Sequence, residues 1–171
     1  MNMNLATQTP LASATRLPQE LVESTTFLLK RLGFAAKDRT LAAYEETGLH
    51  PYHHAVLLVL DEGAPETQGS IADTLGYDRG QLVGLLDELE ERELVERKRD
   101  PNDRRRHVVR LTPAGKKMLR RLRTLSGQIE DDFLAPLDAE SRQALHNLLF
   151  RVACHHDTRF ERPSEAVSAV G

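Results

Sequence analysis

The chain has few cysteines and aromatic residues, and it has no long apolar run. Its 171 residues include no tryptophan and a single cysteine, Cys154, and only 5% of them are aromatic. One cysteine excludes an intrachain disulfide and suits a reducing compartment. No apolar run reaches the roughly 20 residues of a membrane-spanning helix, and the N-terminus lacks the apolar segment of a signal peptide. We therefore expect a soluble cytoplasmic protein that does not enter membranes.

The sequence also lacks the usual signatures of catalysis. It contains no glycine-rich phosphate loop, no pairing of a nucleophile with a base and no carboxylate dyad. We therefore predict that the protein is not an enzyme and that it has no cofactor.

Positive charge, by contrast, is concentrated in one stretch. Residues 92–123 contain thirteen basic and four acidic residues, which gives them a local net charge of +9. The whole chain carries −3, so the remaining residues sum to −12. A dense positive patch on an acidic chain is typical of proteins that bind the phosphate backbone of nucleic acids.

The middle of the chain predicts a helix-turn-helix. Thr67 is placed to cap a helix that Gly76 ends in a left-handed conformation. Asp78 then caps a second helix, with Gln81 in the position of a capping box. Two helices around such a short turn form the motif whose second helix enters the major groove of DNA. The apolar face of this second helix consists of Leu82, Leu85, Leu86 and Leu89.

A β-hairpin is predicted directly after these helices. Leu94–Arg99 and His107–Leu111 are rich in β-forming residues, and residues 100–104 between them have the composition of a type I turn. A hairpin with a basic tip in this place forms a wing. The predicted fold class is therefore mainly α with a small β-hairpin, a winged helix-turn-helix.

Long helices are predicted on both sides of this module. One runs from Pro18 to near Gly48, with a bend at Gly33, and another begins at Thr112 and ends before Pro136. Their apolar stripes have no other helix to cover them, which favours packing against a second subunit. The predicted regions are a flexible arm (1–17), a helical dimerisation region (18–49 and 112–157), a winged helix-turn-helix domain (50–111) and a flexible tail (158–171).

Eight short motifs run through the two helices, the wing and the start of the next helix. They are Ile71-Ala72, Leu75-Gly76, Asp78-Arg79, Leu86-Asp87, Leu89-Glu90, Leu94-Val95-Glu96-Arg97, Asp100-Pro101-Asn102-Asp103-Arg104-Arg105 and Leu111-Thr112-Pro113-Ala114-Gly115. In these motifs the chain resembles the MarR family of bacterial winged helix-turn-helix regulators. The resemblance implies a homodimer that binds an inverted-repeat operator in double-stranded DNA and usually represses. It also implies release, usually by a small phenolic or aromatic carboxylate ligand and sometimes by oxidation or a metal.

The resemblance places base contacts in the first turns of the second helix. Arg79 would reach a guanine or a phosphate, Gln81 would pair with an adenine, and Val83 would meet a thymine methyl. The alternatives are a solvated arginine and a capping glutamine. Gly80 and Gly84 stand where the family commonly has side chains, which favours a close approach of the DNA backbone.

The predicted DNA contacts of the wing are Lys98, Arg99, Asp103, Arg104, Arg105 and Arg106. The Asp103-x-Arg105 pair matches a family signature in which the aspartate orients an arginine at the minor groove. Arg104 or Arg106 could enter the minor groove in place of Arg105. The other interpretation is that the hairpin tip is solvated and does not contact DNA. Basic residues of the following helix form either its solvated face or further DNA contacts: Lys116, Lys117, Arg120, Arg121 and Arg123.

A histidine cluster lies beside the expected hinge between the dimerisation helices and the DNA-binding domain. His50, His53 and His54 would hydrogen-bond an aromatic carboxylate, with Arg16 or Arg31 as the counter-charge. The alternative is that these histidines are exposed or cap the core.

Other functions stay open at the level of sequence. A metal- or redox-responsive regulator, or a metal-dependent enzyme, would use these histidines or the Cys154-His155-His156 run. Adjacent residues of one helix diverge by about 100°, however, and make poor joint ligands. A winged-helix module for protein binding would turn its basic hairpin toward an acidic partner. A DNA-bound regulator would be associated with the nucleoid.

Overall fold

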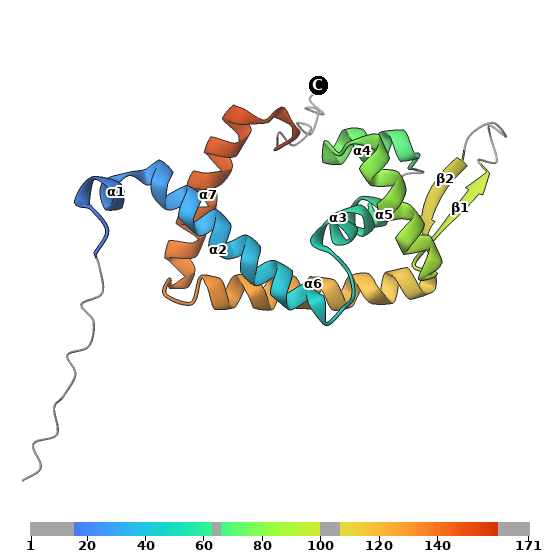
Figure 1. The fold of residues 1–171 in the computed structure, drawn as a ribbon, viewed down its shortest axis with the longest axis horizontal. Helices are drawn as coiled ribbons and strands as arrows, with labels where there is room; N and C mark the ends of the chain where they lie inside the picture. The colour runs from blue at the N-terminus through green and yellow to red at the C-terminus, as the bar shows by residue number, and fades with distance from the viewer. Residues whose placement is uncertain (1–15, 63–65, 100–106, 161–171) are drawn as a thin grey trace, which may run out of the picture. The chain divides into compact units, whose positions relative to one another are not determined.

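The computed structural model describes residues 16–62, 66–99 and 107–160. The chain forms two compact units, Met1–Lys37 and Asp38–Gly171. In these ranges, seven α-helices and a two-stranded hairpin follow one another in the order that Figure 1 labels, with the hairpin between α5 and α6.

The first unit contains α1 (Gln19–Glu23) and the N-terminal part of α2 (Thr25–Glu45). The single helix predicted from Pro18 is therefore wrong. Ser24 adopts an extended backbone, with φ −80° and ψ 110°, and its hydroxyl oxygen accepts a hydrogen bond from the Phe27 N–H at 3.3 Å. This capping contact starts α2 as a separate helix.

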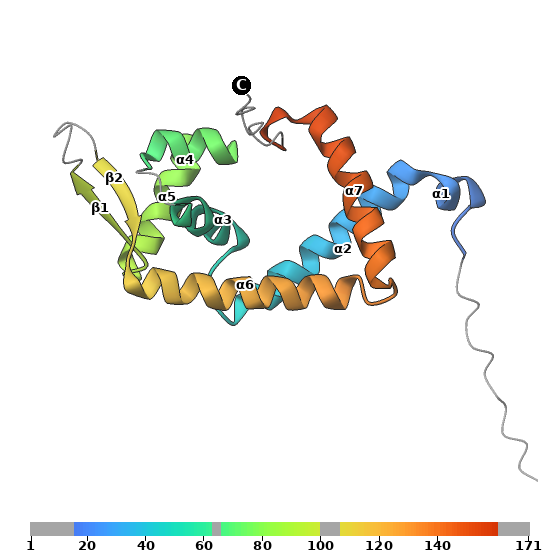
Figure 2. The ribbon, with the colours of Figure 1, turned by 180° about the vertical axis from the view of Figure 1, so that it is seen from behind.

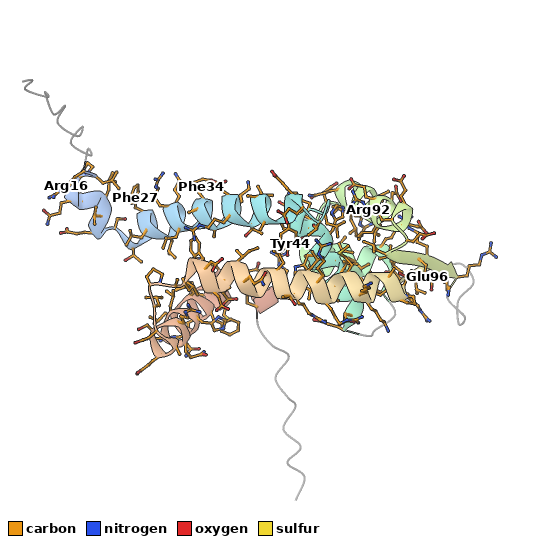
Figure 3. All side chains as sticks on the ribbon, turned by 90° about the horizontal axis from the view of Figure 1, so that it is seen from below. Arg16, Phe27, Phe34, Tyr44, Arg92 and Glu96 are labelled. Atoms are coloured by element: carbon orange, nitrogen blue, oxygen red, sulfur yellow. The ribbon has the colours of Figure 1, made fainter. Side chains whose placement is uncertain are left out.

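The helix α2 continues without a break through Gly33, the position of the predicted bend. Figure 3 shows the side chains along α2, with Phe27 and Phe34 labelled. The exposed large apolar side chains of the first unit are Leu17, Leu21, Val22, Leu28, Leu29, Leu32 and Phe34.

The core of the second unit is built around α3 (Pro51–Asp61), α4 (Gln68–Leu75), α5 (Arg79–Glu91) and the hairpin. The N-terminal half of α6 (Pro113–Phe133) packs against α3, as the view from behind shows (Figure 2). All four predicted apolar residues of α5 are buried. Each fully buried leucine stabilises the fold by roughly 1.5–3 kcal/mol. The largest fully buried side chains are Leu57, Ile71, Leu82, Leu86, Leu89, Leu119 and Leu122.

Local hydrogen bonds fix the turn between α4 and α5. A capping box starts α4: the Ser70 N–H donates to Thr67 Oγ1 at 3.2 Å, and the Thr67 N–H donates to Ser70 Oγ at 2.8 Å. Gly76 ends α4 with φ 65°, in the left-handed region that favours glycine. Asp78 starts α5, and its Oδ1 accepts a bond from the Gly80 N–H at 2.8 Å. The helix-turn-helix predicted from these residues is confirmed.

The wing consists of β1 (Val95–Arg99) and β2 (His107–Leu111), which pair antiparallel with Arg97 opposite Val109. On the other edge of β2, the Val109 N–H donates to the carbonyl oxygen of Glu66 at 2.8 Å. The segment before α4 therefore anchors the hairpin to the helix-turn-helix.

The start of α6 is held against the end of α5. Thr112 Oγ1 accepts from the Gly115 N–H at 2.9 Å and donates to the carbonyl of Glu93 at 2.6 Å. A side chain at position 115 would collide with the carbonyl oxygen of Leu94. Glycine is therefore required where α6 begins.

The last elements of the second unit that the structure describes are α7 (Ala139–His156) and a short 3₁₀ helix, η1 (Thr158–Phe160). Arg142 Nη1 binds Asp131 Oδ1 at 2.7 Å and links α7 to α6. No residue of α7 is buried, and its exposed large apolar side chains are Leu148, Leu149, Phe150 and Val152. Within the described ranges, no helix is both long and apolar enough to cross a membrane.

Candidate nucleic-acid interface

The first turns of α5, the second helix of the motif, carry side chains that are exposed to solvent. Leu82, Leu85 and the other apolar residues face the core, so Arg79, Gln81 and Val83 are left exposed at the helix start. Val83 is 42% exposed although it is apolar. Together, an exposed arginine, glutamine and small apolar side chain in the first turns of a helix supply donors, acceptors and methyl groups of the kind that read base pairs in the major groove.

The capping box predicted around Gln81 is only half formed. Asp78 Oδ1 accepts from the Gln81 N–H at 3.2 Å, but the Gln81 side chain bonds to no described residue. The Gln81 amide is therefore free to form hydrogen bonds with a molecule that binds against α5.

Two glycines of α5 leave space on its surface. A Cβ atom added at Gly84 would meet no atom within 4 Å, and one at Gly80 would meet only Asp78 Oδ1, at 3.0 Å. The fold itself therefore does not require glycine at position 84.

The described wing residues divide into paired and unpaired cations. Lys98 Nζ lies 2.6 Å from Glu96 Oε1, and Figure 3 labels Glu96 on the strand. Arg99 is exposed and has no ion pair with a described residue. The predicted wing-tip contacts, Asp103, Arg104, Arg105 and Arg106, lie outside the described residues.

Acidic residues neutralise part of the basic stretch at 92–123. Arg97 pairs with Asp87 and with Glu90 of α5. Arg123 Nη2 binds Asp61 Oδ2, at the end of α3, at 2.9 Å. The local charge of the stretch therefore overstates the number of cations that are free for DNA.

The three histidines near the start of α3 have separate structural roles. His50 caps the helix, and its Nδ1 accepts from the Tyr52 N–H at 3.3 Å. His53, 3% exposed, accepts from the His50 N–H through Nδ1 at 2.9 Å. Its Nε2 lies 3.2 Å from Glu88 Oε2, at ion-pair distance but not aligned as a hydrogen bond.

His54 is 8% exposed, and its Nδ1 lies 2.6 Å from the Tyr44 hydroxyl of α2. Its Nε2 is buried without a hydrogen bond to any described residue. Burial lowers the pKa values of both His53 and His54 below their ordinary 6.5. A neighbouring positive charge, Arg123, lowers that of His54 further.

These contacts favour the core-capping interpretation for His54, whereas His50 and His53 also line a pocket of about 390 Å³ together with Glu88. Arg16 and Arg31, the predicted counter-charges, belong to the first unit and are exposed. Among residues 16–62, 66–99 and 107–160, no group of three His, Cys, Asp or Glu side chains is arranged to hold a metal ion.

A pocket that sequence reasoning missed lies between the C-terminal part of α2 and the middle of α6. Its volume is about 360 Å³, within the range of small-molecule sites. Arg121, Thr124, Leu125 and Gln128 recur at helical spacing, a signal that the repeated basic residues of α6 obscured. The lining residues are Ala43, Glu46, Thr47, Arg121, Thr124, Leu125 and Gln128.

Comparisons with known proteins agree with this geometry. Residues 47–106 match the sequence model of the MarR family. A putative transcriptional regulatory protein for the hcr operon of Thauera aromatica is 30% identical over 129 residues, which cover 71% of this chain and 78% of the relative.

Solved structures extend the similarity to the helices on both sides. The transcriptional repressor CouR bound to a 23-mer DNA duplex superposes with a TM-score of 0.72 at 35% identity, over 81% of this chain and 99% of the repressor. CouR from Rhodococcus jostii RHA1 bound to p-coumaroyl-CoA has a TM-score of 0.67 at 31% identity, over 80% and 96% of the two chains.

Proposed function

Because the chain belongs to the MarR family of transcriptional regulators, we propose that it is a homodimeric repressor released from its operator by a small aromatic ligand. The observation that carries DNA binding is the exposure of Arg79, Gln81 and Val83 in the first turns of α5, together with Arg99 of β1, which has no ion pair with a described residue. These two elements pack against each other. They can therefore approach one duplex together, with α5 in the major groove and the wing at phosphates and the minor groove.

Two subunits would place their α5 helices in successive major grooves, about 34–36 Å apart. The apolar side chains left exposed on α1, on α2 and on α7 support dimerisation, since such surfaces on soluble proteins usually mark interfaces. CouR in complex with a DNA duplex supports the same use of the fold.

The pocket between α2 and α6 is the proposed effector site. The Arg121 guanidinium can bind a carboxylate, and Leu125 offers an apolar wall. The hydroxyls of Thr47 and Thr124 donate to the carbonyls of Tyr44 and Arg120, so their oxygens can accept a hydrogen bond from a phenol. CouR binds p-coumaroyl-CoA, which supports an aromatic acid or its thioester as the ligand. Binding between α2 and α6 would shift the population toward dimers whose α5 helices no longer match the operator spacing.

The test begins with duplexes selected from a random-sequence pool by the wild-type protein. Affinity for the selected duplex should fall steeply with rising salt, because phosphate contacts release counterions. Arg79→Ala and Arg105→Ala should each weaken binding by about 1–3 kcal/mol, whereas Arg151→Ala on α7 should have little effect. A failure to enrich any sequence, or affinity independent of salt, would favour the protein-binding module instead.

The same complex can then be titrated with hydroxybenzoic and hydroxycinnamic acids and their coenzyme A thioesters. We expect at least one of these ligands to dissociate the wild-type complex. Arg121→Gln should bind the duplex as the wild type does but should require more ligand for release. If Arg121→Gln responds to the same ligand concentration as the wild type, the pocket is not the effector site.

A further inference from the structure

Arg97 of β1 belongs to the basic stretch but does not point to solvent. Its side chain is 22% exposed. Its Nη2 donates to Asp87 Oδ1 at 2.6 Å, and its Nη1 pairs with Glu90 Oε2. The backbone N–H of Arg97 also donates to Glu90 Oε1, at 3.3 Å. One carboxylate of α5 thus holds both the main chain and the side chain of this residue.

A third group completes the environment of the guanidinium. The Gln68 amide, oriented with its oxygen toward Arg97, accepts bonds from Nε and Nη2 at 3.2 Å each. Gln68 is the first residue of α4, and Asp87 and Glu90 lie on α5. One side chain of the wing therefore bonds to both helices of the helix-turn-helix. A planar guanidinium suits this arrangement, because it can donate several hydrogen bonds in fixed directions.

We propose that Arg97 is a positioning residue that holds the wing at a fixed place relative to α5. This inference rests on the proposed DNA-binding function. It assigns Arg97 no contact with DNA: the residue acts through Asp87 and Glu90, and Lys98 and Arg99 next to it make the contacts. A wing released from α5 would no longer reach its phosphates while α5 occupies the major groove.

The competing role, a direct phosphate contact, predicts the opposite sign for one variant. If Arg97 bound phosphate, Asp87 and Glu90 would compete with DNA for its guanidinium. Asp87→Asn combined with Glu90→Gln would then free Arg97 and tighten DNA binding. If Arg97 positions the wing, the same double variant removes the negative charges that hold its guanidinium and weakens binding.

The experiment is a mutant cycle on the duplex selected by the wild type, with dissociation constants measured by fluorescence anisotropy. We expect Arg97→Gln and the Asp87→Asn/Glu90→Gln double variant each to weaken binding about tenfold. The triple variant should be no weaker than either, because the changes interrupt the same interaction. Tighter binding by the double variant, or additive losses in the triple variant, would overturn the proposal.

Arg123→Gln is the matched control, because it removes a cation that also pairs with a carboxylate, Asp61 at 2.9 Å, but outside the wing. It should change the duplex affinity less than twofold, and an equal loss would mean that net charge alone explains Arg97→Gln. Thermal unfolding by circular dichroism checks that each variant is folded. The double variant retains Arg97, so the sign of its effect decides the question even if Arg97→Gln does not fold.

Failure of the proposed function is distinguishable from failure of this inference. If the wild type enriches no duplex, the proposed DNA-binding function is wrong, and so is the role of Arg97 that depends on it. If the wild type binds but the double variant binds more tightly, only the positioning role is wrong.

Discussion

At the scale of single residues, His54 shows how burial changes the chemistry of an imidazole. It is 8% exposed and contacts the Tyr44 hydroxyl, so its neutral form is favoured in the folded protein. Burial, and then the charge of Arg123, lower its pKa from the ordinary 6.5. In the unfolded chain the same group takes up its proton near 6.5.

The unfolded state therefore binds more protons than the folded state below pH 6.5. The stabilisation is fully present above that value and is lost as the pH falls toward the lowered pKa of the folded protein. His53 contributes in the same direction, because burial is the largest influence on its pKa and outweighs the opposing charge of Glu88.

We predict that the free energy of unfolding decreases between pH 7.5 and pH 5.5, as measured by urea denaturation. His54→Gln should lower stability at pH 7.5 but should remove part of this pH dependence, since His53 retains its own contribution. His146→Gln, at an exposed position on α7, is the control and should retain the wild-type pH dependence. An unchanged slope for His54→Gln would show that other groups are responsible.

The histidines also show the limit of sequence analysis at this scale. Spacing placed His50, His53 and His54 together, but their partners Tyr44 and Glu88 come from other helices and only the fold brings them near. Arg97 was hidden for the same reason, because its carboxylate partners lie seven and ten residues earlier in the chain.

At the scale of elements, α5 carries a glycine that the packing of the described residues does not require. A methyl group at Gly84 would clash with no residue that the structure describes. Glycine in a helix interior costs roughly 0.5–1 kcal/mol relative to alanine. This loss of stability is offset if the absence of a side chain lets the DNA backbone come close to α5 at Gly84 and so strengthens binding.

We predict that Gly84→Ala raises the free energy of unfolding by about 0.5–1 kcal/mol but weakens binding to the selected duplex. Gly127→Ala on α6 is the matched control, because that glycine also has no atom near its added Cβ. It should give the same gain in stability without a change in affinity. Equal affinities for the two variants would exclude a close approach of DNA at Gly84.

Element boundaries were predictable where the signal is local. The caps Thr67, Asp78 and Thr112 each accept a bond from a backbone N–H two or three residues ahead, so the residue type alone identified these helix starts. Ser24 was missed because the apolar spacing continues across it, and periodicity does not register a single extended residue.

At the scale of the whole molecule, apolar surface is concentrated on the flanking helices. Leu148, Leu149 and Val152 are all more than 40% exposed on α7. Burying such side chains in a dimer would recover the hydrophobic free energy that one subunit leaves unused.

We predict that Leu149→Glu converts the dimer to a monomer at micromolar concentration, as measured by analytical ultracentrifugation. Binding to the inverted repeat should then weaken by more than about tenfold, because each half-site is held by one subunit alone. Asn147→Glu adds the same charge to an exposed polar position of α7 and should remain dimeric. A wild-type protein that sediments as a monomer would contradict the dimer.

The bond from Glu66 to Val109 has a consequence for how the protein behaves when concentrated. It occupies one edge of the hairpin, while Glu90 accepts the Arg97 N–H on the other edge. A strand from another molecule could not bond to the N–H groups of Val109 and Arg97, in the middle of the two strands, because both already donate hydrogen bonds. It would also meet the charged side chains of Glu96 and Lys98. The hairpin is thereby protected from growing into an intermolecular sheet, the route by which exposed strands start aggregation.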